Sequence, residues 1–363
     1  MASWSDLPTD LLGLIAGRLG AYPIDHAQFA AVCRSWRATV REHDRRLPWI
    51  VTRAAPEHIF IPFNSLTQNF EHLPNGDGAH TVGSTDEWLL VGLGTKHEAK
   101  HRIKWIYREY ILHNPFSNTT MPLTVLNDVI TNIGTCLILK FLMRSTIDDF
   151  IAVVTNNTNY PLIVFKEGKG AWLPEHATPY LYIIDVAFIG DKLYAITKAE
   201  DLIPFDLALD EEEDENGEEE DDGTHRFNFS YEYKSDEETD ETVIISRHLI
   251  VSCGKLLLVR QHKITSCTAI LSIRRVDVLE ADPSTSTWVP LPIGTGLGGG
   301  GAIFLSTNFS KSVSAPCGEV EEDVVYDIYT GEVFDMKSKT PRQGHFCMPF
   351  QGKTWLFPPE SAL

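Results

Sequence analysis

Short β-type segments separated by turns follow one another through most of the chain and limit the folds that it can adopt. Between Ile59 and Phe357, runs of apolar, β-branched and aromatic residues alternate with turn sequences such as Asn75–Gly78 and Asp282–Ser284. No stretch after His43 has the pattern of a long helix. Many short strands at this spacing are typical of an all-β domain.

A loose repeat indicates which kind of all-β domain this is. In each copy a strand ends in a turn, and a Trp or another apolar residue follows, often with Leu-Pro. The copies are His113–Leu123, Phe165–Glu175, Glu280–Pro292 and, more weakly, Tyr326–Met336. Neighbouring copies are about 40–50 residues apart, except across one long gap, and a four-stranded propeller blade has about this length.

We therefore predict one kelch-like β-propeller, with six blades favoured over five or seven and a pair of β-sandwiches as the alternative. The strands of Phe346–Phe357 are expected to pair with Ile59–Phe63 and close the ring, which would remove exposed edges. The runs Gly190–Tyr194 and Gly254–Leu257 both begin Gly-(Asp)-Lys-Leu and are expected to start equivalent strands.

The N-terminal residues have a different period. Apolar residues recur at helical spacing in two groups, and the residues of each group lie on one face of a helix. These are Leu7, Leu11, Leu12, Ile15 and Leu19, then Phe29, Val32, Cys33, Trp36 and Val40. Pro8 suits a first helical turn, and Asp25 suits a helix cap. Such a short segment cannot bury all these side chains by itself, so it needs either a partner protein or the rest of the chain.

The sequence Leu7–Leu12, then Ile15 and Val32–Arg37, closely resembles the F-box. The resemblance implies three short helices over residues 3–44 that dock on the Skp-type adaptor of Skp–cullin–F-box ubiquitin ligases. It implies a set of residues shared between adaptor contact and internal packing, with Arg37 at the rim. These residues are Leu7, Pro8, Leu11, Leu12, Ile15, Phe29, Val32, Cys33, Trp36 and Arg37.

The remainder resembles the C-terminal kelch-like domain of unknown function found in plant F-box proteins. Its motifs are His113–Phe116, Gly190–Ile196, His248–Leu257, Trp288–Leu291 and Ala302–Ser306. The helical period disappears after His43, so we expect a linker at residues 45–56, with Trp49 and Ile50 buried at the junction, and a target-recognition domain at 57–360. The chain departs from the family pattern near residues 316–325, where Glu321-Glu322-Asp323 follows Cys317, so the outer strand of that blade is uncertain.

The net charge of −19 argues against a nucleic-acid-binding surface, since phosphate contacts need clustered Lys and Arg. Residues 210–222 hold eleven carboxylates and no base, which leaves −8 for the rest of the chain. Such dense like charge predicts a disordered, solvated loop, although a basic substrate could dock there.

Six scattered cysteines (33, 136, 253, 267, 317 and 347) form no CxxC pair. The start of the chain lacks the basic and apolar regions of a signal peptide, and no apolar run is long enough to span a membrane. We therefore expect reduced thiols and a soluble protein of the cytoplasm, the nucleus or both.

Two motifs match catalytic or cofactor patterns without the context that these need. His97–His101 fits HExxH, but the flanking residues are strand-like, so a hairpin loop is expected rather than the helix of a zinc peptidase. Gly294–Gly299 fits GxGxxG, but a strand at Ala302–Leu305 follows instead of a helix. The sequence therefore predicts no cofactor and no metal.

The function predicted from these observations is that of a non-catalytic substrate receptor in a Skp–cullin–F-box ubiquitin ligase. The F-box would bind the adaptor, and through it the cullin, while the β domain would recruit a protein target of unknown identity. Alternatives are an adaptor-binding scaffold or decoy without ligase activity, and a propeller hydrolase with an accessory helical hairpin.

Overall fold

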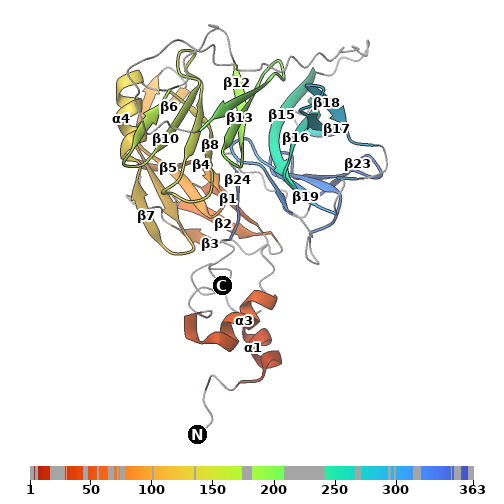
Figure 1. The fold of residues 1–363 in the computed structure, drawn as a ribbon. Helices are drawn as coiled ribbons and strands as arrows, with labels where there is room; N and C mark the ends of the chain where they lie inside the picture. Colours follow the sequence, from red (N-terminus) through yellow and green to blue (C-terminus); the bar gives the residue numbers. More distant parts are fainter. Residues whose placement is uncertain are drawn as a thin grey trace.

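Six β-sheets arranged in a ring, with a separate group of N-terminal helices, make up the described part of the protein (Figure 1). The computed structural model describes residues 4, 7–16, 29, 31–43, 48–54, 57–63, 69–71, 73, 78–99, 102–134, 136–173, 182–207, 242–265, 271–292, 296–297, 300–313, 320–344, 346 and 353–358. The predicted acidic loop at 210–222 lies outside these residues.

The N-terminal group contains helices α1 (Thr9–Ala16) and α3 (Arg34–His43), which contact each other. Pro8 stands just before α1, where its missing N–H costs no hydrogen bond, and its carbonyl accepts the N–H of Leu12 at 3.0 Å. The backbone is also helical at Phe29 and at residues 31–32. Figure 1 draws α1 and α3 below the ring, on the side of strands β2 and β3.

Blades 1 to 3 are antiparallel sheets of four strands each. Blade 1 contains β24 (Thr354–Leu356), β1 (Trp49–Ala54), β2 (Glu57–Pro62) and β3 (Asn69–Glu71). Blade 2 contains β4 (Ala79–Thr85), β5 (Trp88–Ala99), β6 (Arg102–Asn114) and β7 (Thr119–Pro122). Blade 3 contains β8 (Ile138–Met143), β9 (Ile151–Thr155), β10 (Leu162–Lys166) and β11 (Gly170–Trp172).

Blades 4 to 6 differ in strand number within the described residues. Blade 4 contains β12 (Ile183–Ile189), β13 (Lys192–Thr197) and β14 (Leu202–Asp206). Blade 5 contains β15 (Thr242–Ser252), β16 (Lys255–Thr265), β17 (Leu271–Asp282) and β18 (Thr287–Pro290). Blade 6 contains, in spatial order, β20 (Lys311–Val313), β19 (Ala302–Leu305), β21 (Val324–Asp327), β22 (Glu332–Asp335) and β23 (Thr340–Gln343).

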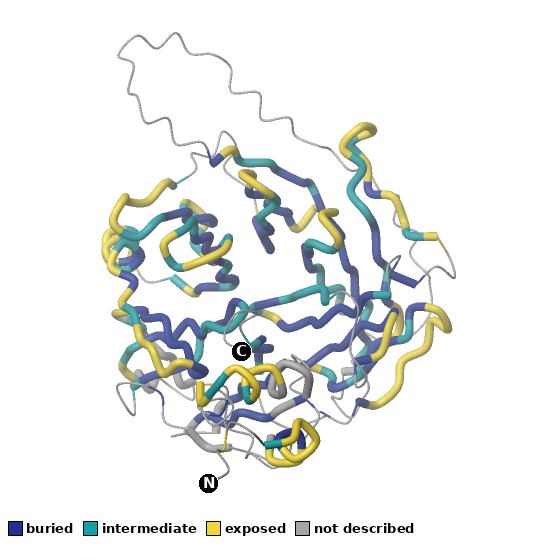
Figure 2. The backbone as a smooth tube through the Cα atoms, turned by 60° about the horizontal axis from the view of Figure 1, so that its bottom comes forward, coloured by how far each residue is buried: buried dark blue, intermediate teal, exposed yellow. Residues whose placement is uncertain are grey.

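The innermost strands of the blades contact one another around the ring. β24 contacts β4, and the contacts continue through β8, β12 and β15 to β20 of blade 6. Each blade therefore buries its faces against its two neighbours, and Figure 2 shows buried residues along much of the ring and exposed residues mainly at its outer turns. The architecture is a six-bladed β-propeller, as the sequence predicts, and not a pair of sandwiches.

The ring closes through a strand that the sequence places in the linker. β24 pairs with β1 (Val51 opposite Thr354), and β1 in turn pairs with β2. The expected direct pairing of the C-terminal strand with Ile59–Phe63 is therefore wrong, because β1 lies between them. Trp49 and Ile50, expected to be buried at the junction, are buried, and they belong to the propeller itself.

Blade 6 has an irregular topology. β19 and β21 are parallel, and the chain between them includes β20, which lies inside the ring. The side chain of Asn308 donates to the carbonyl of Val82 in blade 2, while Ser312 Oγ lies 2.8 Å from Ser252 Oγ in blade 5. Residues 308–312 therefore cross the central channel. β22 and β23 supply the outer strands that the sequence left uncertain.

One helix interrupts the β domain. α4 (Thr124–Ile133) connects blade 2 to blade 3, where no helix is expected from the sequence. Its Leu126 and Ile130 are buried and pack in the same cluster as Phe141 of β8. Gly134 ends the helix at φ 86°, a conformation that favours glycine.

Candidate functional site

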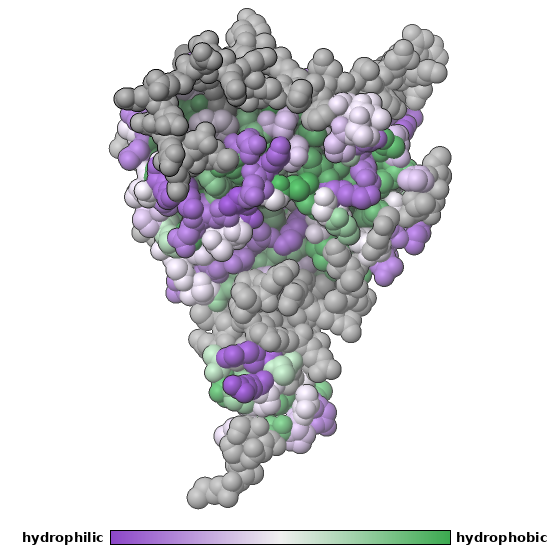
Figure 3. All heavy atoms as spheres, in the orientation of Figure 1, coloured by the Kyte–Doolittle hydropathy of each residue, from purple (hydrophilic) through white to green (hydrophobic). Residues whose placement is uncertain are grey.

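The first candidate site is the apolar surface of the helical group. Leu11 is 44% exposed, and Leu14, Ile15, Val32 and Trp4 are also exposed to solvent. Apolar atoms appear on this group in the space-filling view (Figure 3). Large apolar side chains on helices this short expose area that water disfavours, so they mark a surface suited to a partner.

Two of the residues predicted to bind the adaptor pack inside the module instead of facing outward. Leu12 is 1% exposed, and Phe29 is also buried. The Phe29 ring lies 4.3 Å from that of Trp36, whose Nε1 donates to the carbonyl of Trp4 at 3.1 Å. These contacts hold the helices together, so Leu12 and Phe29 shape the surface from below.

The other predicted residues lie at or near the surface. Pro8, Leu11, Ile15, Val32 and Arg37 are exposed, and Leu7, Cys33 and Trp36 are half-buried. Sequence reasoning missed Trp4 and Leu14. Leu14 follows Leu11 at a three-residue spacing, so the helical period could have revealed it.

Cys33 stands at the start of α3 in a polar setting. Its Sγ lies 3.1 Å from Ser35 Oγ. This hydrogen bond, then the backbone N–H of Trp36 and the nearby Arg37, lower the pKa of the thiol. Cys33, Cys136 and Cys253 are free thiols; positions 267, 317 and 347 lie outside the described residues.

The second candidate site is the face of the ring at which the innermost strands begin, here called the distal face. It is defined by three exposed apolar side chains: Leu137 before β8, Tyr182 before β12 and Tyr329 after β21. Tyr329 belongs to this face because β21 runs opposite to the inner strand β20. None of these three side chains is predicted from the sequence to form a binding surface.

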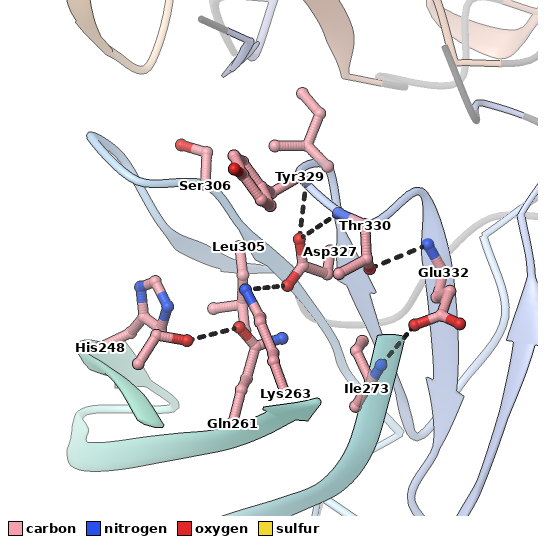
Figure 4. A network of polar contacts seen from close by, with 12 residues as sticks. His248, Gln261, Lys263, Ile273, Leu305, Ser306, Asp327, Tyr329, Thr330 and Glu332 are labelled. Carbon is pink, nitrogen blue, oxygen red and sulfur yellow. Dashed lines mark hydrogen bonds and ion pairs between the residues drawn. The ribbon is translucent and has the colours of Figure 1, made fainter. Parts of the chain in front are cut away.

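A polar network fastens blade 5 to blade 6 beneath Tyr329 (Figure 4). Lys263 Nζ lies 2.6 Å from Asp327 Oδ2, and Asp327 Oδ1 accepts the N–H groups of Tyr329 and Thr330 at 2.7 and 3.1 Å. Glu332 accepts the N–H of Ile273 at 2.6 Å. The network fixes the backbone of Tyr329 and so presents its ring on a rigid support.

The channel holds a cavity of ≈ 220 Å³ lined by inner strands of blades 3 to 5 and by residues 308–312. Lys140 Nζ lies 3.0 Å from Asp185 Oδ2, and Asp185 also accepts the N–H groups of Val186 and Leu249 at 2.9 and 3.0 Å. Lys311 pairs with Asp86 at the other side of the cavity. Because these charges are paired, the cavity wall is polar but electrically balanced.

His248 lies buried beside this cavity. Its Nδ1 is 3.1 Å from Ser310 Oγ. Burial, and then the charges of Lys140 and Lys263, hold its pKa well below the usual value, while Gln261 acts in the opposite direction. His248 is therefore a neutral, structural histidine at neutral pH.

The motifs that resemble catalytic patterns have no supporting geometry. His97–Ala99 belongs to strand β5, with His97 opposite Lys104, so the helix required by HExxH is not formed there; residues 100–101 lie outside the described part. Strand β5 therefore includes residues that were expected to belong to a hairpin loop. Within the described residues, no three His, Cys, Asp or Glu side chains are grouped to hold a metal. Of the GxGxxG stretch, residues 296–297 are described, and β19 follows as expected.

Comparisons with known proteins assign both domains of the chain to known families of domains. Residues 4–47 match the F-box domain, and residues 61–347 match the KIB1-4 beta-propeller. A "Putative F-box protein At1g65770" of Arabidopsis thaliana is 47% identical over 49 residues, which cover 14% of this chain and 13% of that protein. The chain therefore matches only a small fraction of that relative's length.

Several solved structures are similar in shape at low scores. They include the N-terminal domain of Nup159, with a TM-score of 0.35 and 10% identity over 86% of this chain and 76% of that one. Another is "YCF48 bound to D1 peptide", with a TM-score of 0.37 and 9% identity over 83% and 78%. Scores this low add nothing to the assignment, which rests on the family matches.

An F-box joined to a six-bladed propeller defines a class of two-domain proteins with a helical module and a β ring. Within that class, the chain belongs to the KIB1-4 beta-propeller family. The kelch-like type of the propeller stays a prediction. Among the described helices, none is long and apolar enough to cross a membrane.

Proposed function

We propose that this protein is the substrate-receptor subunit of a Skp–cullin–F-box ubiquitin ligase. The observation that carries the proposal is the exposed apolar face of the F-box, formed by Leu11, Ile15 and Val32 above the buried Leu12 and Phe29. A face of this kind is completed by a partner, and F-box domains generally bind Skp-type adaptors.

The mechanism is proximity. The F-box holds the receptor on the adaptor and, through it, on the cullin scaffold, while the propeller holds the target. The target's effective concentration near the ubiquitin-charged enzyme rises, and the receptor makes and breaks no covalent bond itself. We propose that this takes place in the cytoplasm, the nucleus or both.

Adaptor binding is tested with exposed residues, because their replacement leaves the core intact. Leu11→Asp and Val32→Asp should each weaken binding of the purified full chain to a Skp-type adaptor by about 30-fold or more, since each places a charge in an apolar contact. Val289→Asp, at an exposed apolar position on β18, is the control and should bind like the wild type. Unchanged binding by both F-box variants would exclude this surface as the adaptor site.

A second experiment separates a receptor from an adaptor-binding scaffold. The complex with adaptor, cullin and charging enzymes is reconstituted, and ubiquitin transfer to proteins bound by the propeller is measured. A receptor transfers ubiquitin in a manner that depends on Leu11. Adaptor binding without any transfer to bound proteins would favour the scaffold or decoy.

A further inference from the structure

The distal face combines exposed apolar residues with a position away from the F-box. Leu137, Tyr182 and Tyr329 are 52%, 57% and 58% exposed, the highest values for large apolar side chains in the described part of the propeller. Trp49, where the chain enters from the F-box, pairs with Leu356 at the end of inner strand β24. Since inner strands begin at the distal face, the F-box joins the ring at the opposite face.

Each distal tyrosine carries a lysine over its ring. Lys198 Nζ lies 5.9 Å from the ring centre of Tyr182, and Lys263 Nζ lies 5.6 Å from that of Tyr329. An ammonium group over an aromatic face is attracted by the ring and holds its orientation. The two rings are therefore supported and still exposed, which is typical of aromatic anchors in binding surfaces.

The buried carboxylates near these tyrosines are paired with cations of blade 5. Arg247 and Arg260 both contact Glu200, which is buried under them, and Asp327 is buried against Lys263. The arginines and Lys263 thus neutralise these buried carboxylates, whereas Lys198 and Arg274 are exposed. Asp201, in the same turn as Lys198, is half-buried, so the exposed charged side chains described around these tyrosines are cationic, although the net charge of the chain is −19.

Blade 5 forms a raised wall at the edge of this face. The N–H of Leu249 donates to Asp185 in β12, which places these two positions at one level of the ring. β15 begins at Thr242, well before Leu249, whereas β12 begins at Ile183. The long ribbon of β15–β17 therefore projects beyond the start of β12 and carries Lys263 and Arg274 along its projecting part, while Arg247 lies level with the start of β12.

We infer that the distal face binds an acidic segment of the target protein, with a large apolar side chain packed on Tyr182 or Tyr329 and carboxylates beside Lys198 and the blade 5 cations. Charge complementarity selects this partner over a basic or neutral one. This inference rests on the proposed function and names its substrate class. It also places adaptor and target on opposite faces of the ring.

The test uses a display library of random linear peptides selected on the full chain. The expected pool is enriched in Asp and Glu with one large apolar residue, and a synthetic peptide from it should bind about tenfold more weakly to Tyr182→Ala and to Tyr329→Ala. Lys198→Glu should weaken binding about fivefold and reduce its dependence on salt. Val289→Ala, exposed but away from this face, should bind like the wild type.

The inference is overturned if the pool shows no acidic enrichment, if nothing is selected, or if the double variant Tyr182→Ala/Tyr329→Ala selects the same peptides. Adaptor binding is measured on the same proteins and should be unchanged by every distal substitution. Loss of peptide binding with intact adaptor binding supports the inference. Intact peptide binding in a protein that does not bind the adaptor would instead reject the proposed function alone.

Discussion

The F-box and the propeller differ in how far they bury their apolar side chains. In α1, the buried Leu12 lies next to Leu11 and close to Leu14 and Ile15, all of which face solvent. In β9 every residue from Ile151 to Thr155 is buried. One region leaves apolar surface exposed to solvent, and the other covers its own.

The difference follows from geometry. Two helices of eight and ten residues have one shared interface, so among the described residues of the module the apolar side chains outside it stay exposed. A blade lies between two neighbours, and ring closure by β24 and β1 gives every blade both. An exposed apolar side chain therefore marks a candidate contact surface in the propeller because such side chains are few for its size, and in the F-box because they lie next to one another.

Removing a central aromatic residue should show how far the propeller depends on closure. Trp355 is fully buried in β24, its Nε1 donates to the carbonyl of Leu305 at 2.9 Å, and its ring lies 5.1 Å from that of Phe304. Trp355→Ala should lower the free energy of unfolding by about 3–5 kcal/mol, measured by urea denaturation. Tyr329→Ala, which removes an exposed ring, should change it by less than about 0.5 kcal/mol. If both variants lost the same free energy of unfolding, the stability of the propeller would not depend on ring closure by β24.

Leu12 and Leu11 allow the same comparison within one helix. Leu12→Ala should destabilise the F-box by about 2–5 kcal/mol, because it removes a buried side chain. Leu11→Ala should change stability by less than about 0.5 kcal/mol and weaken only adaptor binding. Hydrogen exchange of the α1 and α3 amides measures the first effect, and adaptor affinity measures the second. A large loss of protection in Leu11→Ala would show that Leu11 is part of the core.

The smallest predicted effect concerns pH and the interior of the ring. The pKa of His248 is lowered in the folded state, so between that value and its unfolded pKa only the unfolded chain binds the proton. Stability should therefore fall as the pH falls below about 6.5, by at most about 1.4 kcal/mol per pH unit from this group. In His248→Gln the slope, measured by urea denaturation at several pH values, should be smaller. A residual slope is expected from His113, whose pKa burial also lowers. An unchanged slope would mean that His248 takes up its proton in the folded ring.

The regular part of the fold follows from the sequence because local patterns encode it. The four repeat copies correspond to the hairpins β6–β7, β10–β11, β17–β18 and β21–β22. Gly190 and Gly254 have φ values of 57° and 75° in the turns after β12 and β15, the equivalent positions that their shared run predicts. Turn residues and alternation act over a few residues, which a single sequence displays directly.

The parts that sequence reasoning missed depend on distant partners. β1 pairs with the neighbouring β2 along its full length, but its place between β2 and β24 is set by a strand from far along the chain, and the position of β20 is set by contacts with blades 2 and 5. The distal face likewise combines residues from several blades, such as Tyr182 and Tyr329. α4 is the exception, since Leu126, Val129 and Ile133 fall at helical spacing, and only its short length hid it.

The pairing of β24 with β1 also affects how the protein folds during translation. β1 is synthesised before blades 2 to 6, but its partner β24 is synthesised after them, so the first blade stays incomplete until β24 has been made. Until then its free edge and apolar faces are open to aggregation and to chaperones. A chain that stops before Thr354 never gains the strand that closes the circle. Such a product would carry the F-box beside an open ring with an unpaired edge at β1, the kind of edge that chaperones bind.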